Sequence, residues 1–405
     1  MNLFSFIAGV SSPNDLWTIL INWIKGSIGN LGWTILFLTV LVKLVTTPLD
    51  FAVKLSTKKQ TLVQQKCAPQ IAKLRKKYGN NEQAIRTQTN SLYKREGLKM
   101  GTGCIIMLVN MVLTCVIFFS FYSTLRKVSA YEAINQYEQI EASYTSAYYQ
   151  GLADYDENDE FVTTDDAKNW IAKLEQLQKE DPESTELLEM ETFVTENEEL
   201  FKFATEKACK SAIDKWDEVK ESWLWVDNIW VADATTRPFP TYENLEKTAS
   251  NAGNYYKEYV SKNINKTEYT KIASVISSSS TDKNNGYYIL AVLAGVVTFL
   301  SQMITDLHTK LRNKKANKLA KAANKQNGMS MKIMKIIMPI IMVGFVLSAS
   351  ASFGIYLLAS NIASIAFGEI IALIVNKMTK KKQQEVEEEL EKEANRLIKK
   401  GQLQE

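Results

Sequence analysis

The stretch that decides the fold is residues 32–53, which read GWTILFLTVLVKLVTTPLDFAV. A helix needs about 20 mostly apolar residues to cross the hydrocarbon layer of a bilayer, and this stretch has that length. Lys43 interrupts it near the middle, and Asp50 lies near its far end. A charge at mid-membrane costs about 2.5–3.5 kcal/mol on insertion scales, so we expect Lys43 to face water or a partner group.

Four further stretches have the apolar length of a membrane span, so the sequence predicts an all-α membrane protein with five spans. The last of them contains a single charged residue, Glu369. The predicted spans are residues 32–53, 101–125, 286–306, 333–350 and 352–376. Before the first span, residues 1–31 form a segment with an interfacial helix over Leu16–Ile28, which is too short to span and carries two tryptophans. No signal peptide is expected.

The charges between the predicted spans set the orientation. Residues 54–100 hold about 12 Lys and Arg against about 2 acids, and residues 307–335 hold about 9 against none. Short basic loops stay in the cytoplasm. The long segment 126–285 has about 32 acids against roughly 16 basic residues, which fits the outside. With five spans, the N-terminus lies outside and the C-terminus in the cytoplasm.

The segments outside the membrane are predicted to be helical. Residues 54–100 form a basic cytoplasmic hairpin, with a kink or helix start at Pro69, a turn at residues 79–81 and a second helix over Glu82–Arg95. The acidic insert, residues 126–285, is too long for an unstructured loop. Within it, residues 164–166 cap one helix and Asp181-Pro182-Glu183 restarts another. Residues 307–332 form a basic loop, and residues 377–405 form a charged, solvated tail helix rather than an RNA-binding one.

One segment of the insert is unusually aromatic, Trp223-Leu224-Trp225-Val226-Asp227-Asn228-Ile229-Trp230. It suits the outer membrane surface, where tryptophan is enriched. A small aromatic core beneath Pro238 and Pro240 is an equally good interpretation. The sequence leaves both open.

The chain offers little for catalysis. His308 is its only histidine, and its four cysteines lack the spacing of a disulfide framework or a zinc site. It has no phosphate-binding glycine loop and no Ser/His/Asp set. We expect no enzyme activity, no cofactor, no metal site and no contact with DNA.

Polar residues in the first span lie on the side of Lys43. Thr39, Thr46 and Thr47 are four before, three after and four after it, so helix geometry places all of them on its face. Asp50 lies two turns away, and we expect that to be too far for direct contact. Glu369 lies near the inner end of its span, at another depth. An unpaired cation in a water-filled cavity is therefore the favoured interpretation, and a buried ion pair is the alternative.

Other predicted spans offer polar positions that match this face. They are Asn110 and Thr114 in the second span, Thr298, Ser301 and Gln302 in the third, and Ser360, Asn361 and Ser364 in the fifth. Taken singly, each of these also suits a hydrogen bond that packs one helix on another.

Several short segments, most of them in or beside the predicted spans, carry a resemblance to a known family. They are Asn30-Leu31-Gly32-Trp33, Thr39, Lys43, Pro48-Leu49, Ala68-Pro69-Gln70-Ile71, Leu92-Tyr93-Lys94, Gly101-Thr102-Gly103-Cys104, Trp225 to Asp233, Met338-Pro339-Ile340, Tyr356 and Ser360-Asn361. On these segments the chain resembles the YidC/Oxa/Alb family of membrane protein insertases. It departs from the family in Lys43, where arginine is usual, in Leu357, where tryptophan is usual, and in Asn110-Met111-Val112, where Gln-Met-Pro is common.

The resemblance implies a five-helix bundle with a hydrophilic groove that is open to the cytoplasm and to lipid. Nascent membrane proteins would be the clients, held near Lys43 and released as their apolar segments enter the bilayer. The ribosome and the general protein translocation channel are further partner hypotheses, and the location is a bacterial cell membrane. The groove residues are Lys43, Thr39, Thr46, Thr47, Asn110, Thr114, Gln302, Ser360 and Asn361. Positive charge, rather than the resemblance, indicates the cytoplasmic recruitment residues, which are Lys58, Lys59, Lys73, Arg75, Lys76, Lys77, Arg312, Lys314 and Lys315.

Two other functions remain as alternatives. A small-solute transporter or channel would predict internal repeats or paired broken spans, and the sequence has neither. A membrane anchor that presents the acidic insert as a binding module would need no charge at Lys43, so substitution of that residue separates it from an insertase.

Overall fold

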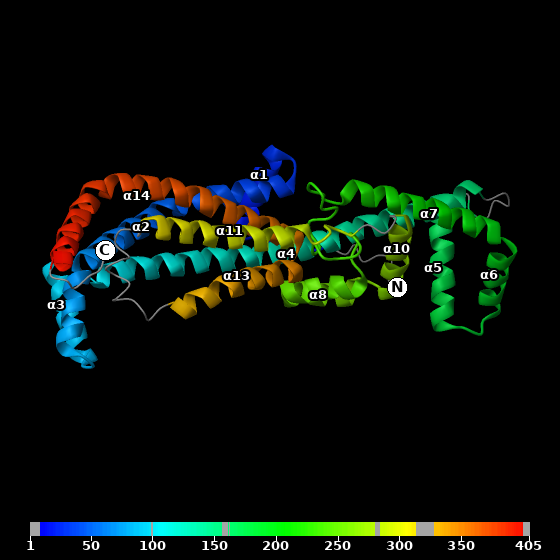
Figure 1. The fold of residues 1–405 in the computed structure, drawn as a ribbon. Coiled ribbons are helices and arrows are strands. Elements are labelled where there is room, and N and C mark those ends of the chain that lie inside the picture. The colour runs from blue at the N-terminus through cyan, green and yellow to red at the C-terminus, as the bar shows by residue number, and fades with distance from the viewer. Residues whose placement is uncertain are drawn as a thin grey trace. The chain divides into compact units, whose positions relative to one another are not determined.

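The fold is described from a computed structural model, and the described residues are 9–98, 100–155, 161, 163–279, 284–312 and 328–399. Within these ranges the chain forms thirteen helices (Figure 1). Their bounds are α1 Leu16–Ile28, α2 Leu31–Tyr78, α3 Glu82–Arg95, α4 Met100–Tyr155, α5 Thr164–Glu180, α6 Thr185–Glu196, α7 Glu198–Val219, α8 Tyr242–Ala252, α9 Asn254–Asn263, α10 Lys266–Ser279, α11 Ile289–Arg312, α13 Gly328–Ser348 and α14 Ala351–Lys399. Extended pairing in the described residues is limited to a bridge between Trp223 and Val226.

The chain divides into two compact units, which we describe separately. The insert unit comprises Met1–Trp33, Tyr122–Tyr288 and Ala349–Phe353. The span unit comprises Thr34–Phe121, Ile289–Ser348 and Gly354–Glu405.

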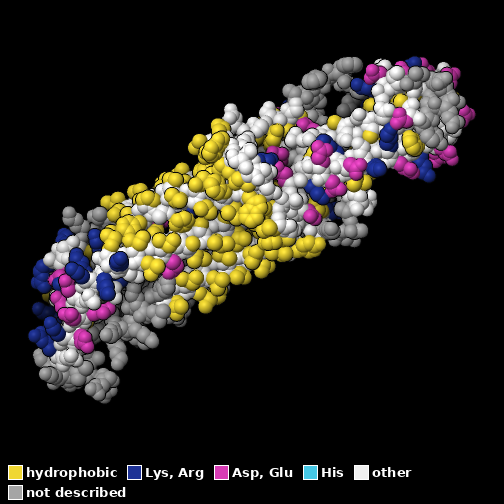
Figure 2. Space-filling view, turned by 90° about the horizontal axis from the view of Figure 1, so that it is seen from above, with side chains coloured by type: hydrophobic (Ala, Val, Ile, Leu, Met, Phe, Trp, Pro, Cys, Tyr) yellow, Lys and Arg dark blue, Asp and Glu magenta, His cyan; other side chains and the backbone are white. Residues whose placement is uncertain are grey.

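Among the residues that the structure describes, three helices are long and apolar enough to cross a membrane. They cover Leu31–Tyr78, Ile105–Asp154 and Ala351–Lys392, and shorter apolar helices cover Ile289–Ile304 and Ile337–Ser348. Hydrophobic side chains cover a broad surface in Figure 2, with few charged side chains among them. Such a surface is stable against lipid and would be a liability in water. The chain is therefore a helical membrane protein.

The helix ends follow from local capping chemistry. Asp15 accepts a hydrogen bond from the Thr18 amide at the start of α1, and Asn81 accepts one from the Ala84 amide at the start of α3. Both helices have the bounds that the sequence predicts. The cap of α5 is Thr163, in a reciprocal capping box with Asp166, so that helix begins at Thr164 rather than at residue 167. The cap of α6 is Ser184, two residues after Pro182.

The long helix α2 runs without a break from the first predicted span to Tyr78. Pro69 lies inside it, so this proline starts no new helix. Cys67 and Ile71 of α2 pack against Leu92 of α3, which folds α3 back onto the end of α2. The break between the two helices is at Gly79, whose φ of 53° is a conformation that glycine adopts without strain.

Small residues let the helices of the span unit approach closely. A Cβ added to Gly295 of α11 would lie 2.7 Å from a Val343 methyl group on α13, and one added to Gly354 of α14 would lie 3.1 Å from Val346. Interfaces between helices in a membrane are enriched in such residues because packing, rather than the hydrophobic effect, holds them together. Phe121 of α4 contributes a ring contact at 4.6 Å to Tyr356 of α14.

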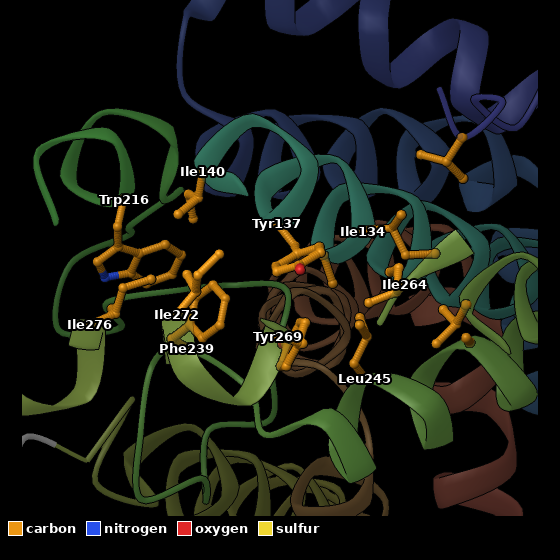
Figure 3. Packing of buried hydrophobic residues seen from close by; sticks show 14 of the residues in the cluster. Ile134, Tyr137, Ile140, Trp216, Phe239, Leu245, Ile264, Tyr269, Ile272 and Ile276 are labelled. Carbon is orange, nitrogen blue, oxygen red and sulfur yellow. The ribbon is translucent and has the colours of Figure 1, made fainter. Parts of the chain in front are cut away.

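The insert unit has its own apolar core (Figure 3). Tyr137 of α4 and Phe239 pack on the ring of Tyr269 of α10, with centroids 4.6 and 5.6 Å apart. The hydroxyl of Tyr269 donates to the carbonyl of Pro240 at 2.8 Å, so this fully buried side chain has its polar atom satisfied. The acidic segment is thus a folded helical body.

A smaller core holds the far end of the insert unit together. Leu152, Phe161, Ala167, Leu200 and Ala204 form it. A Cβ on Gly151 would come within 2.7 Å of the Ala204 Cα, so α4 and α7 touch backbone to backbone at this point. The intervening residues form a separate arm that contains α5 and α6.

The aromatic segment at residues 223–230 is mostly buried inside the insert unit. Trp230 is 1% exposed and Trp223 is 5% exposed, whereas Leu224 is 62% exposed. The side-chain nitrogen of Asn228 donates to the carbonyl of Pro238 at 3.2 Å, and the backbone amide of Asn228 donates to Oδ1 of Asn285 at 2.7 Å. The small aromatic core is therefore the interpretation that describes this segment.

This segment also caps α14. The amides of Ala351 and Ser352 donate to the carbonyls of Val231 and Ile229, both at 2.8 Å. The first amides of a helix have no acceptor within the helix, so these contacts supply what α14 lacks at its start.

A half-buried carboxyl group on α4, that of Glu132, has a pKa raised by its surroundings. Burial raises the pKa of Glu132 on α4 to about 7, Glu221 nearby raises it further, and Lys25 of α1 opposes the shift. Lys25 is itself paired with Glu221. Because the pKa is raised on folding, ionisation of Glu132 costs stability as the pH rises from about 4.5 through about 7.

We predict that Glu132→Gln stabilises the protein at pH 8 and has little effect at pH 5. The amide removes the cost of a desolvated charge, a gain of at most about 3 kcal/mol. Thermal unfolding in detergent at both pH values measures it, with the exposed Glu189→Gln as the matched control. A difference between variant and wild type that is the same at both pH values would contradict the assignment.

Candidate functional site

The candidate site is built on the apolar half of α2, where Lys43 lies. The hydroxyls of Thr46 and Thr47 donate to the carbonyl of Lys43 at 3.0 and 2.8 Å, and that of Thr39 donates to Ile35 at 2.6 Å. The threonines on the face of Lys43 thus donate their hydroxyl protons to backbone carbonyls of α2, and only their oxygens can still accept a hydrogen bond.

Lys43 forms an ion pair with Asp50, its ammonium nitrogen lying 2.9 Å from Oδ2. The expectation that Asp50 is too distant is wrong, and so is the picture of Lys43 as an unpaired cation. Seven residues span about 10.5 Å of helix and just under two full turns, so both side chains leave the same face. The long flexible stem of lysine then reaches along that face toward the shorter aspartate.

Asn110 of α4 completes this group. Its side-chain nitrogen donates to Oδ1 of Asp50 at 3.3 Å, so the carboxylate is held from two helices. The side chains of Lys43 and Asp50 are 23% and 24% exposed. We name Lys43, Asp50 and Asn110 the charged triad. Its formal charge is zero, because the one cation and the one anion offset each other.

A second polar group joins α11 to α14. Asn361 donates to the hydroxyl oxygen of Thr298 at 3.2 Å, and that hydroxyl donates to the carbonyl of Ala294 at 2.7 Å. The side-chain oxygen of Gln302, one turn further along α11, is buried without a hydrogen-bond partner. Ser360 forms a side-chain hydrogen bond with Tyr356, within α14. An unsatisfied buried oxygen costs about 1–3 kcal/mol, which marks Gln302 as a group that a further donor would stabilise.

The structure brings together only part of the predicted groove. Asn110 donates to Asp50, the ion-pair partner of Lys43, and Asn361 donates to Thr298. Thr114, by contrast, is exposed on α4. Asp50 is the residue that the sequence analysis failed to include. The sequence does indicate Asp50, because it follows Lys43 by seven residues and this separation places both on one face of a helix.

The predicted recruitment residues are not equally accessible. Lys58 is buried and donates to Gln383 of α14 at 2.7 Å, and Lys73 and Arg75 also have interaction partners. Lys76 is exposed, and Lys77 lies over the ring of Tyr78. The side chain of Arg312, and Lys314 and Lys315 as a whole, lie outside the described residues.

Lys59 lines a cavity of about 300 Å³ between α2, the end of α3 and α14. Beside it, the ammonium group of Lys66 lies 2.9 Å from Glu96 and 3.6 Å from Glu389. The glutamate-rich run of α14 thus offsets part of the positive charge on α2. The exposed basic surface of α2 is smaller than the count of lysines suggests.

Comparison with known families identifies the chain. The family described as 60Kd inner membrane protein matches residues 23–191 and 216–385, which is well over half of the sequence. The chain belongs to the 60Kd inner membrane protein family. The match includes both helices of the charged triad and the aromatic segment, and it confirms the resemblance to the YidC insertases.

Individual relatives in this family align over a shorter region. A protein named membrane protein insertase YidC from Stenotrophomonas maltophilia (strain K279a) is 36% identical over 103 residues, which are 25% of this chain and 17% of the relative. Those of Chlorobium limicola and Paracoccus denitrificans are 32% and 31% identical over 104 and 106 residues, each 26% of this chain and 17% and 15% of the relative. The aligned region is thus about a sixth of each relative. No solved structure matches the chain significantly.

Proposed function

We propose that this protein inserts nascent membrane proteins into the bacterial cell membrane and helps them to fold. The observation that carries the proposal is a charged triad inside apolar helices of a chain that belongs to the 60Kd inner membrane protein family. Charged side chains in membrane-spanning segments are rare and mark the paths of substrates. Several relatives are named membrane protein insertases.

The proposed architecture has five spans, with the N-terminus outside and the C-terminus in the cytoplasm. The hairpin of α2 and α3 then lies in the cytoplasm, and the insert unit lies outside. The asymmetry of basic residues supports this orientation. The groove would run along the polar residues of α2, α4, α11 and α14.

In the proposed mechanism the groove lowers the cost of moving a polar tail across the membrane. A carboxylate of the client exchanges with Asp50 on the ammonium group of Lys43, so the client charge is paired while Asp50 keeps its hydrogen bond from Asn110. The apolar segment of the client then slides into lipid, and its transfer from water drives the step at about 25 cal/mol per Å². For acidic tails the membrane potential adds to this drive. No bond of the client is broken.

The cytoplasmic partners are also proposals. The exposed lysines near the end of α2, such as Lys76, would attract the anionic surface of a ribosome that carries the nascent chain. The general protein translocation channel is a second proposed partner. The tail helix, which has nearly balanced charges, is not assigned a separate function.

We predict that Lys43→Arg preserves insertion of a single-span client with an acidic N-terminal tail, whereas Lys43→Ala and Lys43→Glu impair it. Loss of one contact of about 1.4 kcal/mol lowers the occupancy of the groove about tenfold. Protease protection of the client in cells depleted of their own insertase measures the outcome. Lys247→Ala, a like change at an exposed site on α8 with no proposed role, is the control. Normal insertion by Lys43→Glu at normal protein level would overturn the mechanism.

We also predict that the arm of the insert unit is dispensable for insertion. Replacement of residues 152–203 by a short glycine linker joins Gly151 to Ala204, which already touch, and leaves the main core intact. The same protease-protection assay should give insertion within about twofold of the wild type, since the groove lies in the span unit. Loss of insertion by a deletion protein that melts cooperatively would show that the arm takes part.

A further inference from the structure

The charged triad contains an anion as well as a cation, and this bears on which clients the groove can hold. Asp50 offers two oxygens, one to Lys43 at 2.9 Å and one to Asn110 at 3.3 Å. A carboxylate has about four lone-pair sites, and an ammonium group has three donors. The contacts between the members of the triad therefore leave unused hydrogen-bonding capacity on both ions.

Both ions are also accessible. The side chains of Lys43 and Asp50 are each about a quarter exposed, at 23% and 24%. The hydroxyls of Thr46 and Thr47 donate to the backbone, so the threonines next to the pair do not offer their protons to Asp50. A client side chain can thus approach either member of the pair without displacing a buried donor.

We propose that Lys43 and Asp50 form a recognition site with two poles, in which Asp50 holds the cationic residues of client tails and Lys43 holds the anionic ones. Asp50 is then the residue that admits clients with basic outer tails. A groove with Lys43 alone would repel such tails, because like charges in a medium of low dielectric destabilise each other strongly. With Asp50 the site has no net charge, and a client ammonium group meets a carboxylate. Asn110 is a positioning residue that orients this carboxylate.

The Lys43–Asp50 ion pair also determines how a client charge enters the site. A client charge of either sign enters by exchange. It takes the place of the like-charged member of the Lys43–Asp50 pair, and the displaced ion then pairs with an opposite charge on the client tail or is hydrated by water. Exchange between pairs avoids the stage at which a charge stands alone, and that stage is the costly one when a buried pair is broken. The site thus distinguishes charged tails from neutral ones, which gain nothing from either pole.

The test measures insertion into liposomes that contain the full-length protein and have no membrane potential, which would otherwise favour acidic tails. Three single-span clients differ only in two tail residues, which are Asp, Asn or Lys. Asp50→Asn should lower insertion of the Lys client about tenfold and leave the other two unchanged or faster. Asp50→Glu should restore the Lys client. Glu369→Gln, an acid-to-amide change in another predicted span, is the matched control.

A second variant covers the case in which Asp50→Asn does not accumulate. Lys43→Gln combined with Asp50→Asn leaves no unpaired charge, and it should slow the Asp and Lys clients alike while the Asn client is unchanged. The inference rests on the proposed insertase function, and the controls distinguish failure of that function from failure of the role assigned to Asp50. If the wild type inserts none of the clients better than protein-free liposomes do, the proposed function fails. If the wild type inserts them and Asp50→Asn leaves the ratio of Lys to Asn clients unchanged, the role of Asp50 alone fails.

Discussion

A charge in the hydrocarbon layer must be paired, and that constraint organises the membrane part of this protein. Lys43 meets it through Asp50 on its own helix, and Asp50 is held in turn by Asn110 of α4. Replacement of such a pair by apolar residues is often neutral or stabilising, so the pair is not explained by stability alone. An ion pair whose two side chains are each about a quarter exposed instead suits exchange with the charges of a passing chain.

Elsewhere in the span unit several polar side chains are hydrogen-bonded and small residues let the helices pack, although side-chain oxygens of Thr89, Gln302 and Asn376 are buried without a partner. Threonine hydroxyls donate to their own helices, Asn361 donates to Thr298, and Gly295 and Gly354 allow close contacts. Large apolar side chains such as Val45 point outward, where lipid is the expected surroundings. The charged triad and the unsatisfied oxygen of Gln302 are the groups to which we assign the proposed binding of a polar client.

Much of this organisation could be predicted from the sequence, because it depends on local signals. The bounds of α1 and α3 follow from Asp15 and Asn81 as capping residues, and the membrane character follows from apolar length. The features that were not predicted depend on how far a side chain reaches or on contacts between residues distant in the sequence. Asp50 was set aside because its backbone is two turns from Lys43, although both side chains leave one face. The aromatic segment could not be placed, since its burial depends on Asn228 meeting Asn285, 57 residues later.

The proposed groove can be tested by comparing residues that line it with a residue on another face of α2. The polar positions of α2, α4 and α11 are proposed to line one path, and Val45, which is 76% exposed on α2, lies on another face of the same helix as Lys43. The most direct measurement is photo-crosslinking from positions 43, 110 and 302, with position 45 as control, to a ribosome-stalled nascent membrane protein. The proposed groove predicts adducts with the client's tail from 43, 110 and 302 and much weaker ones from 45. Equal capture at all four positions, or capture at 45 alone, would contradict it.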